Sequence, residues 1–323
     1  MSSRLLLCAA LLWLAVSAEA VGSSPVYTAA EVASYAPGSG VFAGLTAPVA
    51  ALGLPSAVTG TNSWDGNLSP FNSHYRDGEI VQVGQGGHIT LRLERFVHPS
   101  PGVASIGVWE NVFLVTGADG RVGTPPGLFG ADSALTEASA DGTNFVSAGL
   151  IEFGWFGNYW ADSLGPFAQI SGSIRADFGR PHGRSPADFS GADYASVLSL
   201  LGGTAGGTWI DLSVTGLERV GWIRFSGVQS GATLEIDAVS INRALAGAPT
   251  LIPVLRLEAA AEANRITFPG SLSHAVYQLQ FSDDLAQNWQ NLGEPIQGTG
   301  NDLLFTDSSS PRPAKRFYRV LLP

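Results

Sequence analysis

Residues 79–94 (EIVQVGQGGHITLRLE) constrain the fold of this chain more than any other stretch. Apolar residues recur at every second position of two segments: Val81, Val83, Ile89, Leu91 and Leu93. This period of two is typical of strands that bury one face. A Gly-rich turn at 84–87 joins the two segments into a strand pair, and 106–111 (IGVWEN) supplies the next strand. The sequence therefore predicts an all-β protein.

The composition fits many strands joined by tight turns. The chain is 45% hydrophobic and only 14% charged, with 40 Gly and 19 Pro, a balance that suits strands and turns better than helices. Its net charge is −10 and Lys315 is its only lysine. Because such a surface repels phosphate groups, we expect neither nucleic acid nor an anionic membrane surface as a partner.

The first residues predict export from the cytoplasm. Residues 1–20 combine a short apolar run with small residues before Ala20, the pattern of a secretory signal peptide that is cleaved after that residue. The only cysteine, Cys8, lies in this segment, so the mature chain is expected to hold no disulfide. No later apolar run is long enough to span a membrane. We therefore expect a protein secreted to the medium or the cell surface, with the periplasm as a further possibility.

The rest of the chain divides into two predicted domains. Residues 21–245 are expected to form a jelly-roll-like β-sandwich. The Ala-, Gly- and Pro-rich stretch 246–253 is expected to be a linker, and 254–323 carries five short strand patterns at the spacing of a small immunoglobulin- or fibronectin-III-like sandwich.

Local signals add a few expectations within the first domain. Residues 29–36 (AAEVASYA) lack helix breakers and indicate a short helix, as do 191–201, which are followed by two glycines. Asp-Gly pairs at 119–120 and 141–142 indicate hairpin turns. Four tryptophans in or beside strand patterns are expected in the core: Trp64, Trp109, Trp209 and Trp222.

A series of short motifs across 31–242 resembles a family of bacterial secreted or cell-surface β-sandwich proteins of the PEP-CTERM-associated type. The matching segments are 37–40 (PGSG), 51–55 (ALGLP), 84–91 (GQGGHITL), 108–111 (VWEN), 139–145 (SADGTNF), 206–212 (GGTWIDL), 223–225 (IRF) and 236–239 (IDAV). The family usually carries an Asp just before its V-F-E-N strand, and 101–105 (PGVAS) has none.

The C-terminal segment is similar to a module that ends many secreted proteins of polysaccharide-degrading environmental bacteria. This resemblance rests on 277–285 (YQLQFSDDL), Trp289 and 317–320 (FYRV). Neither resemblance implies a catalytic activity, and together they imply an extracellular binding or structural role.

The aromatic residues within 153–162 (FGWFGNYWAD) are the strongest candidates for ligand binding. Flat aromatic faces stack on sugar rings, and the neighbouring glycines and asparagine favour a loop that exposes Trp155, Tyr159 and Trp160. The alternative is that Trp155 and Tyr159 cap the core of the sandwich, as large aromatics often do. The sequence leaves both open.

Calcium is the only cofactor that the sequence suggests. Glu110, Asn111 and Asp237 are oxygen donors on strand patterns, where burial is costly unless a cation or hydrogen bonds compensate. The alternative is that backbone N–H groups satisfy these side chains. No Ca²⁺-binding loop of the alternating-Asp type is present in the sequence.

A non-catalytic protein that binds extracellular polysaccharide or glycan is the function that these observations favour. A structural or adhesive surface protein with a protein partner is the first alternative. A glycoside hydrolase is the second, because acidic residues lie on strand patterns, although a nucleophile elbow and zinc-like histidine spacing are both missing from the sequence.

Overall fold

The computed structural model describes residues 24–59, 66–226, 232–250, 256–259, 263–268, 276–284, 288–299, 301–309 and 316–321. The predicted signal peptide and Trp64 lie outside these residues. The chain divides into two compact units, 1–250 and 251–323, and both are all-β, as the alternation predicts.

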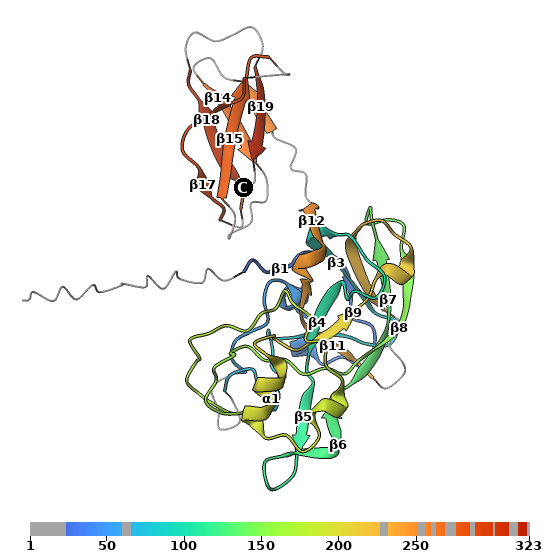
Figure 1. Cartoon of the computed structure of the whole chain (residues 1–323). Coiled ribbons are helices and arrows are strands. Elements are labelled where there is room, and N and C mark those ends of the chain that lie inside the picture. The colour runs from blue at the N-terminus through green and yellow to red at the C-terminus, as the bar shows by residue number, and fades with distance from the viewer. Residues whose placement is uncertain are drawn as a thin grey trace, which may run out of the picture. The chain divides into compact units, whose positions relative to one another are not determined.

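Ten of the described strands form the main sheet system of the first unit (Figure 1). They are β1 (Tyr27–Ala36), β2 (Val81–Val83), β3 (His88–Val97), β4 (Ile106–Glu110), β7 (Asp132–Ser139), β8 (Val146–Phe153), β9 (Thr208–Ile210), β10 (Val220–Ser226), β11 (Leu234–Ile241) and β12 (Ala246–Pro249). The hydrogen-bonded order is β8-β7-β10-β3-β1-β11-β4-β9, with β2 beside β11 and β12 beside β3.

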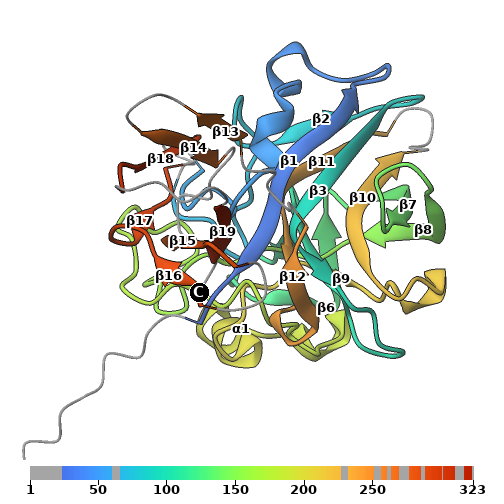
Figure 2. The ribbon, with the colours of Figure 1, turned by 90° about the horizontal axis from the view of Figure 1, so that it is seen from above.

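Strand β1 connects the two layers of this sandwich. Its first residues, Tyr27 and Thr28, pair with β11, whereas the stretch from Ala29 to Ala36 pairs with β3. In the strand order β1 therefore lies between β3 and β11, and Figure 2 shows these three strands near one another. The side chains that point between the layers form a large core that includes Ile89, Leu91, Val108, Ile223 and Val239.

Two sequence expectations are corrected here. Residues 29–36 are a strand rather than a helix, because hydrogen bonds to neighbouring strands outweigh the weak helical preference of their alanines. The strands flanking 84–87 do not pair with each other, since β2 joins β11 while β3 joins β1 and β10. The Gly-rich turn therefore crosses from one layer of the sandwich to the other.

The stretch 246–249, expected as part of a linker, forms β12 and pairs with β3 of the first unit. Both hairpin signals correspond to antiparallel pairs: β5 (Phe113–Thr116) with β6 (Val122–Phe129), and β7 with β8. The sequence placed these two turns correctly.

A second, smaller core covers one end of the first unit. The predicted helix is α1 (Tyr194–Leu201). Asp193 caps its start, because its carboxylate accepts the N–H of Ser196 at 2.9 Å, and Gly202, with φ of 58°, ends it. Its Val197 and Leu201 pack with Leu114 of β5, and Figure 1 shows α1 and the β5–β6 hairpin at the same end of the unit. Short 3-10 turns lie at η1 (Ala43–Leu45), η2 (Pro48–Ala51), η3 (Pro186–Phe189), η4 (Ser213–Thr215) and η5 (Arg243–Leu245).

The second unit is a small sandwich of its own. One sheet contains β13 (Arg256–Ala259), β14 (Asn264–Phe268) and β18 (Leu303–Asp307), and the other contains β15 (Val276–Ser282), β16 (Gln290–Asn291), β17 (Ile296–Gln297) and β19 (Phe317–Leu321). Ile266, Phe268, Tyr277, Leu279 and Phe305 form its core.

Candidate functional site

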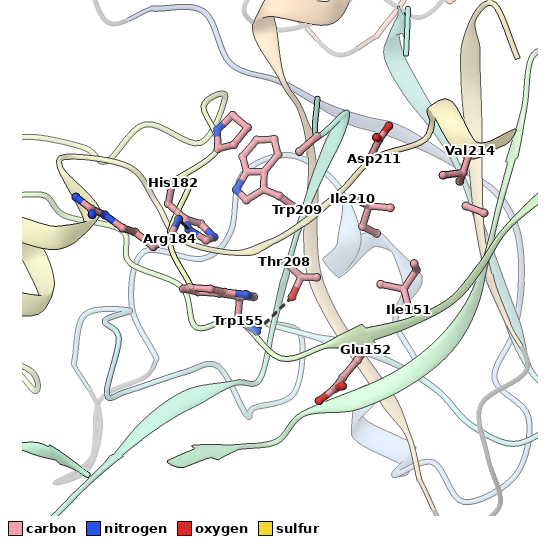
Figure 3. A pocket seen from close by; sticks show the side chains of 14 residues that line it. Ile151, Glu152, Trp155, His182, Arg184, Thr208, Trp209, Ile210, Asp211 and Val214 are labelled. Carbon is pink, nitrogen blue, oxygen red and sulfur yellow. Dashed lines mark hydrogen bonds between the residues drawn. The ribbon is translucent and has the colours of Figure 1, made fainter. Parts of the chain in front are cut away.

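The strand order of the first unit ends at β8 on one side and β9 on the other, and a cavity lies between these two edge strands. We call it the seam cavity. Its volume is about 510 Å³, within the range of ligand pockets. The residues that line it are Ala104, Ala148, Ile151, Glu152, Trp155, Pro181, His182, Gly183, Arg184, Thr208, Trp209, Ile210, Asp211 and Val214 (Figure 3).

Trp155 is held at the mouth of the cavity by its backbone. The N–H groups of Gly154 and Trp155 both donate to Oγ1 of Thr208 at 3.2 Å, which ties the end of β8 to β9. The half-buried indole stacks against the imidazole of His182 with ring centres 4.0 Å apart. It also packs against Phe189 of the smaller core. The indole is therefore fixed in place while one side of it still faces the cavity.

Trp209 forms part of the facing wall. Its indole N–H donates to the carbonyl of Gly206 at 2.8 Å, and its ring meets Trp109 nearly at right angles, with centres 5.9 Å apart. Gly206 and Gly207 have φ of 71° and 81°, and a Cβ on either would collide with the Phe156 carbonyl or the Trp109 ring. The turn before β9 therefore requires two glycines to place Trp209.

His182 is neutral in this arrangement. Its Nδ1 accepts the N–H of Arg184 at 3.0 Å, and its Nε2 lies 3.2 Å from the carbonyl of Gly207, so Nε2 carries the proton. Burial lowers the pKa of His182, and the charge of Arg184 lowers it further. The imidazole is thus a fixed, uncharged surface beside Trp155.

Asp211 supplies a negative charge that is tied to the backbone. Its carboxylate accepts the N–H of Ser213 at 2.8 Å and that of Gly102 at 2.9 Å. Burial acts to raise its pKa, but these hydrogen bonds more than offset that effect and the pKa of Asp211 is lowered. In the view of Figure 3, the carboxyl groups of Asp211 and Glu152 point away from each other.

The structure separates the three predicted sugar-binding residues. Only Trp155 lines the seam cavity. Tyr159 packs on Phe178 with ring centres 5.4 Å apart, and Trp160 packs on Tyr159 with ring centres 4.9 Å apart.

The tryptophans expected in the core differ from one another in burial: Trp109 is buried, whereas Trp209 and Trp222 are half-buried. The prediction therefore missed Trp209, whose strand pattern gave no sign that one face lines a cavity.

The structure gives the three predicted calcium ligands different neighbours. Asp237 forms a buried ion pair with His74, and Asn111 accepts the hydroxyl proton of Ser73 at 2.5 Å. Glu110 is hydrogen-bonded by Thr208, but its Oε1 has no hydrogen-bond partner among the described residues. Across the described ranges, no group of three or more His, Cys, Asp or Glu side chains is arranged to hold a metal ion.

Burial raises the pKa of Glu110 well above its ordinary value, and the charges of Asp132 and Glu235 add to that effect.

Among the described residues, no helix has the length and apolarity needed to cross a membrane.

No protein-family model and no curated protein matches the chain. Among solved structures, it is similar to the crystal structure of a beta-1,2-glucanase from Parabacteroides distasonis, with 12% sequence identity and a TM-score of 0.19. The alignment covers 82% of this chain and 32% of that one. A TM-score this low supports no inference about fold or function.

Proposed function

We propose that this protein is a secreted, non-catalytic binding protein for an extracellular polysaccharide or glycan, and that the ligand binds in the seam cavity. The observation that carries the proposal is the pair of half-buried tryptophans, Trp155 and Trp209, on the walls of one open cavity. Aromatic rings offer flat apolar surfaces on which the C–H faces of sugar rings pack.

The polar groups around the cavity suit a hydroxyl-rich ligand. Glu152 and Arg184 are exposed at its rim, and Asp211 contributes carboxylate oxygens that accept hydrogen bonds. A carboxylate and a guanidinium together provide acceptors and donors for sugar hydroxyls. Because Trp155 and His182 are already packed in place, little side-chain freedom is lost on binding.

Two features favour binding over hydrolysis. Glycoside hydrolases place two carboxyl groups on either side of the scissile bond, one of them with a raised pKa. In this cavity the carboxyl groups of Glu152 and Asp211 point apart in Figure 3. The pKa of Asp211 is lowered, because two backbone N–H groups stabilise its ionised form against the effect of burial.

A specific observation also favours the adhesive alternative. β8 and β9 end the strand order, so each has one edge without a strand partner among the described residues. An extended segment of a partner protein adds to such edges by backbone hydrogen bonds. The same cavity would then be the start of a protein–protein contact.

The test is binding of the full secreted chain to a panel of soluble neutral glucans, xylans and pectins, measured by affinity electrophoresis and then by calorimetry with oligosaccharides. Trp155→Leu keeps an apolar contact with Phe189 but removes the flat ring, and we expect it to weaken binding by about tenfold or more. The matched control, Trp160→Leu, changes an aromatic residue outside the cavity and is expected to bind as the wild type does.

Four outcomes would reject the proposal in different ways. Failure to bind any polysaccharide excludes the ligand class. Equal binding by Trp155→Leu and the wild type places the site elsewhere. Release of reducing ends from a polysaccharide would show a hydrolase. Binding of a β-strand peptide by a chain that binds no glycan would favour the adhesive role.

A further inference from the structure

A second cavity in the first unit is lined mainly by phenylalanine. Its volume is about 590 Å³, and we call it the phenylalanine groove. The residues that line it are Phe71, Asn72, Ser73, Tyr75, Asn111, Phe113, Phe129 and Phe167. Phe129 is 59% exposed, Phe167 51% and Tyr75 42%. Large aromatic side chains gathered around one exposed hollow are the usual mark of a binding site.

The aromatic walls are fixed by secondary structure and packing. Phe113 and Phe129 are register partners on β5 and β6, and their ring centres lie 5.0 Å apart. Phe71 forms the base of the groove: it is buried in the smaller core and packs against Tyr194 with ring centres 5.8 Å apart. The groove is therefore formed before any ligand arrives, which reduces the entropic cost of binding.

Two of the polar side chains that line the groove, Asn72 and Ser73, already make hydrogen bonds. Ser73 donates its hydroxyl proton to Oδ1 of Asn111, and Nδ2 of Asn72 already donates to Oγ1 of Thr59 at 3.0 Å and to the carbonyl of Asn67 at 3.2 Å. Asn111 accepts from Ser73 through its Oδ1, and its side-chain NH₂ makes no hydrogen bond to the described residues. Among the described residues that line the groove, none carries a charge.

These features limit the chemistry of the ligand. A charged molecule would lose its hydration without gaining a counter-ion, and a sugar would bring more hydroxyls than this lining can satisfy. A flat ring would stack on the face of the Phe113–Phe129 pair, above Phe71, and one acceptor atom would meet the side-chain NH₂ of Asn111. We propose that the phenylalanine groove binds a small uncharged aromatic molecule with a single hydrogen-bond acceptor, such as an aryl ester.

This site is separate from the seam cavity and does not depend on the proposed polysaccharide binding. The test is ¹⁹F NMR of methyl 4-fluorobenzoate with the full secreted chain. We expect line broadening that saturates with protein concentration. The charged analogue, 4-fluorobenzoate at neutral pH, should bind at least about tenfold more weakly, because its carboxylate has no cationic partner in the groove. Cellobiose should not displace the ester.

Two variants locate the binding. Phe129→Ala removes an exposed ring and should weaken ester binding by about tenfold or more while the protein stays folded. Asn111→Asp keeps the oxygen that accepts from Ser73 but removes the NH₂ donor, and should also weaken it. The control is Phe42→Ala, which removes a ring that is 70% exposed and lies outside the groove, and should leave binding unchanged.

The proposal is overturned if the ester shows no binding at millimolar concentration, if ester and acid bind equally, or if cellobiose displaces the ester. It is also overturned if Phe129→Ala binds the ester as the wild type does.

Discussion

Nδ1 of His74 lies 2.7 Å from Oδ2 of Asp237, and both side chains are fully buried. The other ring nitrogen, Nε2, lies 2.6 Å from the carbonyl of Ser56, so it must carry a proton. Burial acts to lower the pKa of His74, but the negative charge of Asp237 and its hydrogen bond outweigh that effect and raise it. The buried imidazole thus joins the loops at 56 and 74 to β11.

The first prediction concerns this pair. Asp237→Asn leaves the buried imidazole without a counter-ion, and removal of one partner of a buried ion pair costs about 3–5 kcal/mol. We expect a corresponding decrease in the free energy of unfolding, measured by urea denaturation with tryptophan fluorescence. The control is Glu31→Gln, which breaks an ion pair with Arg92 in which Glu31 is 53% exposed, and should cost less than about 1 kcal/mol. Equal losses in the two variants would contradict the argument.

The second prediction concerns metal removal. The calcium site expected from the sequence requires Glu110, Asn111 and Asp237 to share an ion. In the structure, Asp237 is paired with His74, and Asn111 accepts a hydrogen bond from Ser73. We therefore expect the melting temperature to be the same in EDTA and in millimolar CaCl₂. A ligand that binds only the folded state raises that temperature as its concentration increases. A calcium-dependent increase that is lost in Glu110→Gln would show that Glu110 does bind the ion.

The sequence predicted the sandwich because alternation survives wherever one face of a strand is buried, as in β10 and β18. It failed at β1 for a physical reason. Ala and Glu favour a helix locally, and the pairing that overrides them comes from strands far along the chain. Helix α1 was predictable because its stop signal, the glycine pair at 202–203, is local.

The site was less predictable than the fold, because nearness in sequence does not imply nearness in space. Trp155 and Trp160 are five positions apart, yet only Trp155 lines the seam cavity, and its partner Trp209 comes from another strand. Asp237 lies between apolar residues in the sequence, which predicted a buried carboxylate, but its partner His74 comes from a loop far away in the sequence. A single sequence contains no signal for either pairing.

The third prediction tests the turn that places Trp209. Gly206 has φ of 71°, and a Cβ there would meet the carbonyl of Phe156. We expect Gly206→Ala to lower the free energy of unfolding by about 2 kcal/mol or more, because both backbone strain and a steric clash oppose it. Gly216 has φ of 69° with open space around it, so Gly216→Ala should cost about 1 kcal/mol. A smaller loss for Gly206→Ala than for Gly216→Ala would contradict this account.

The last prediction is a pH dependence that comes from Asp132. Burial and the nearby charge of Glu235 raise the pKa of Asp132 to about 6, from about 4 in an unfolded chain. Between these values the folded state binds more protons than the unfolded state, so this group stabilises the fold below pH 4 relative to neutral pH. That contribution is lost as the pH rises through 6.

Asp132→Asn removes the charge, so the variant does not lose this stability as the pH rises through 6. We expect the variant to be more stable than the wild type by about 1 kcal/mol at pH 7.5, since partial exposure of the side chain screens the effect, and to differ little at pH 4. Urea midpoints at the two pH values measure this difference, and the titration of groups that do not interact with Asp132 cancels in the comparison. Asp119→Asn, in the exposed β5–β6 turn, serves as the control and should change the urea midpoint little. A variant at position 132 that is less stable at pH 7.5 than the wild type would mean that the carboxylate gains more from its neighbours than it loses by burial.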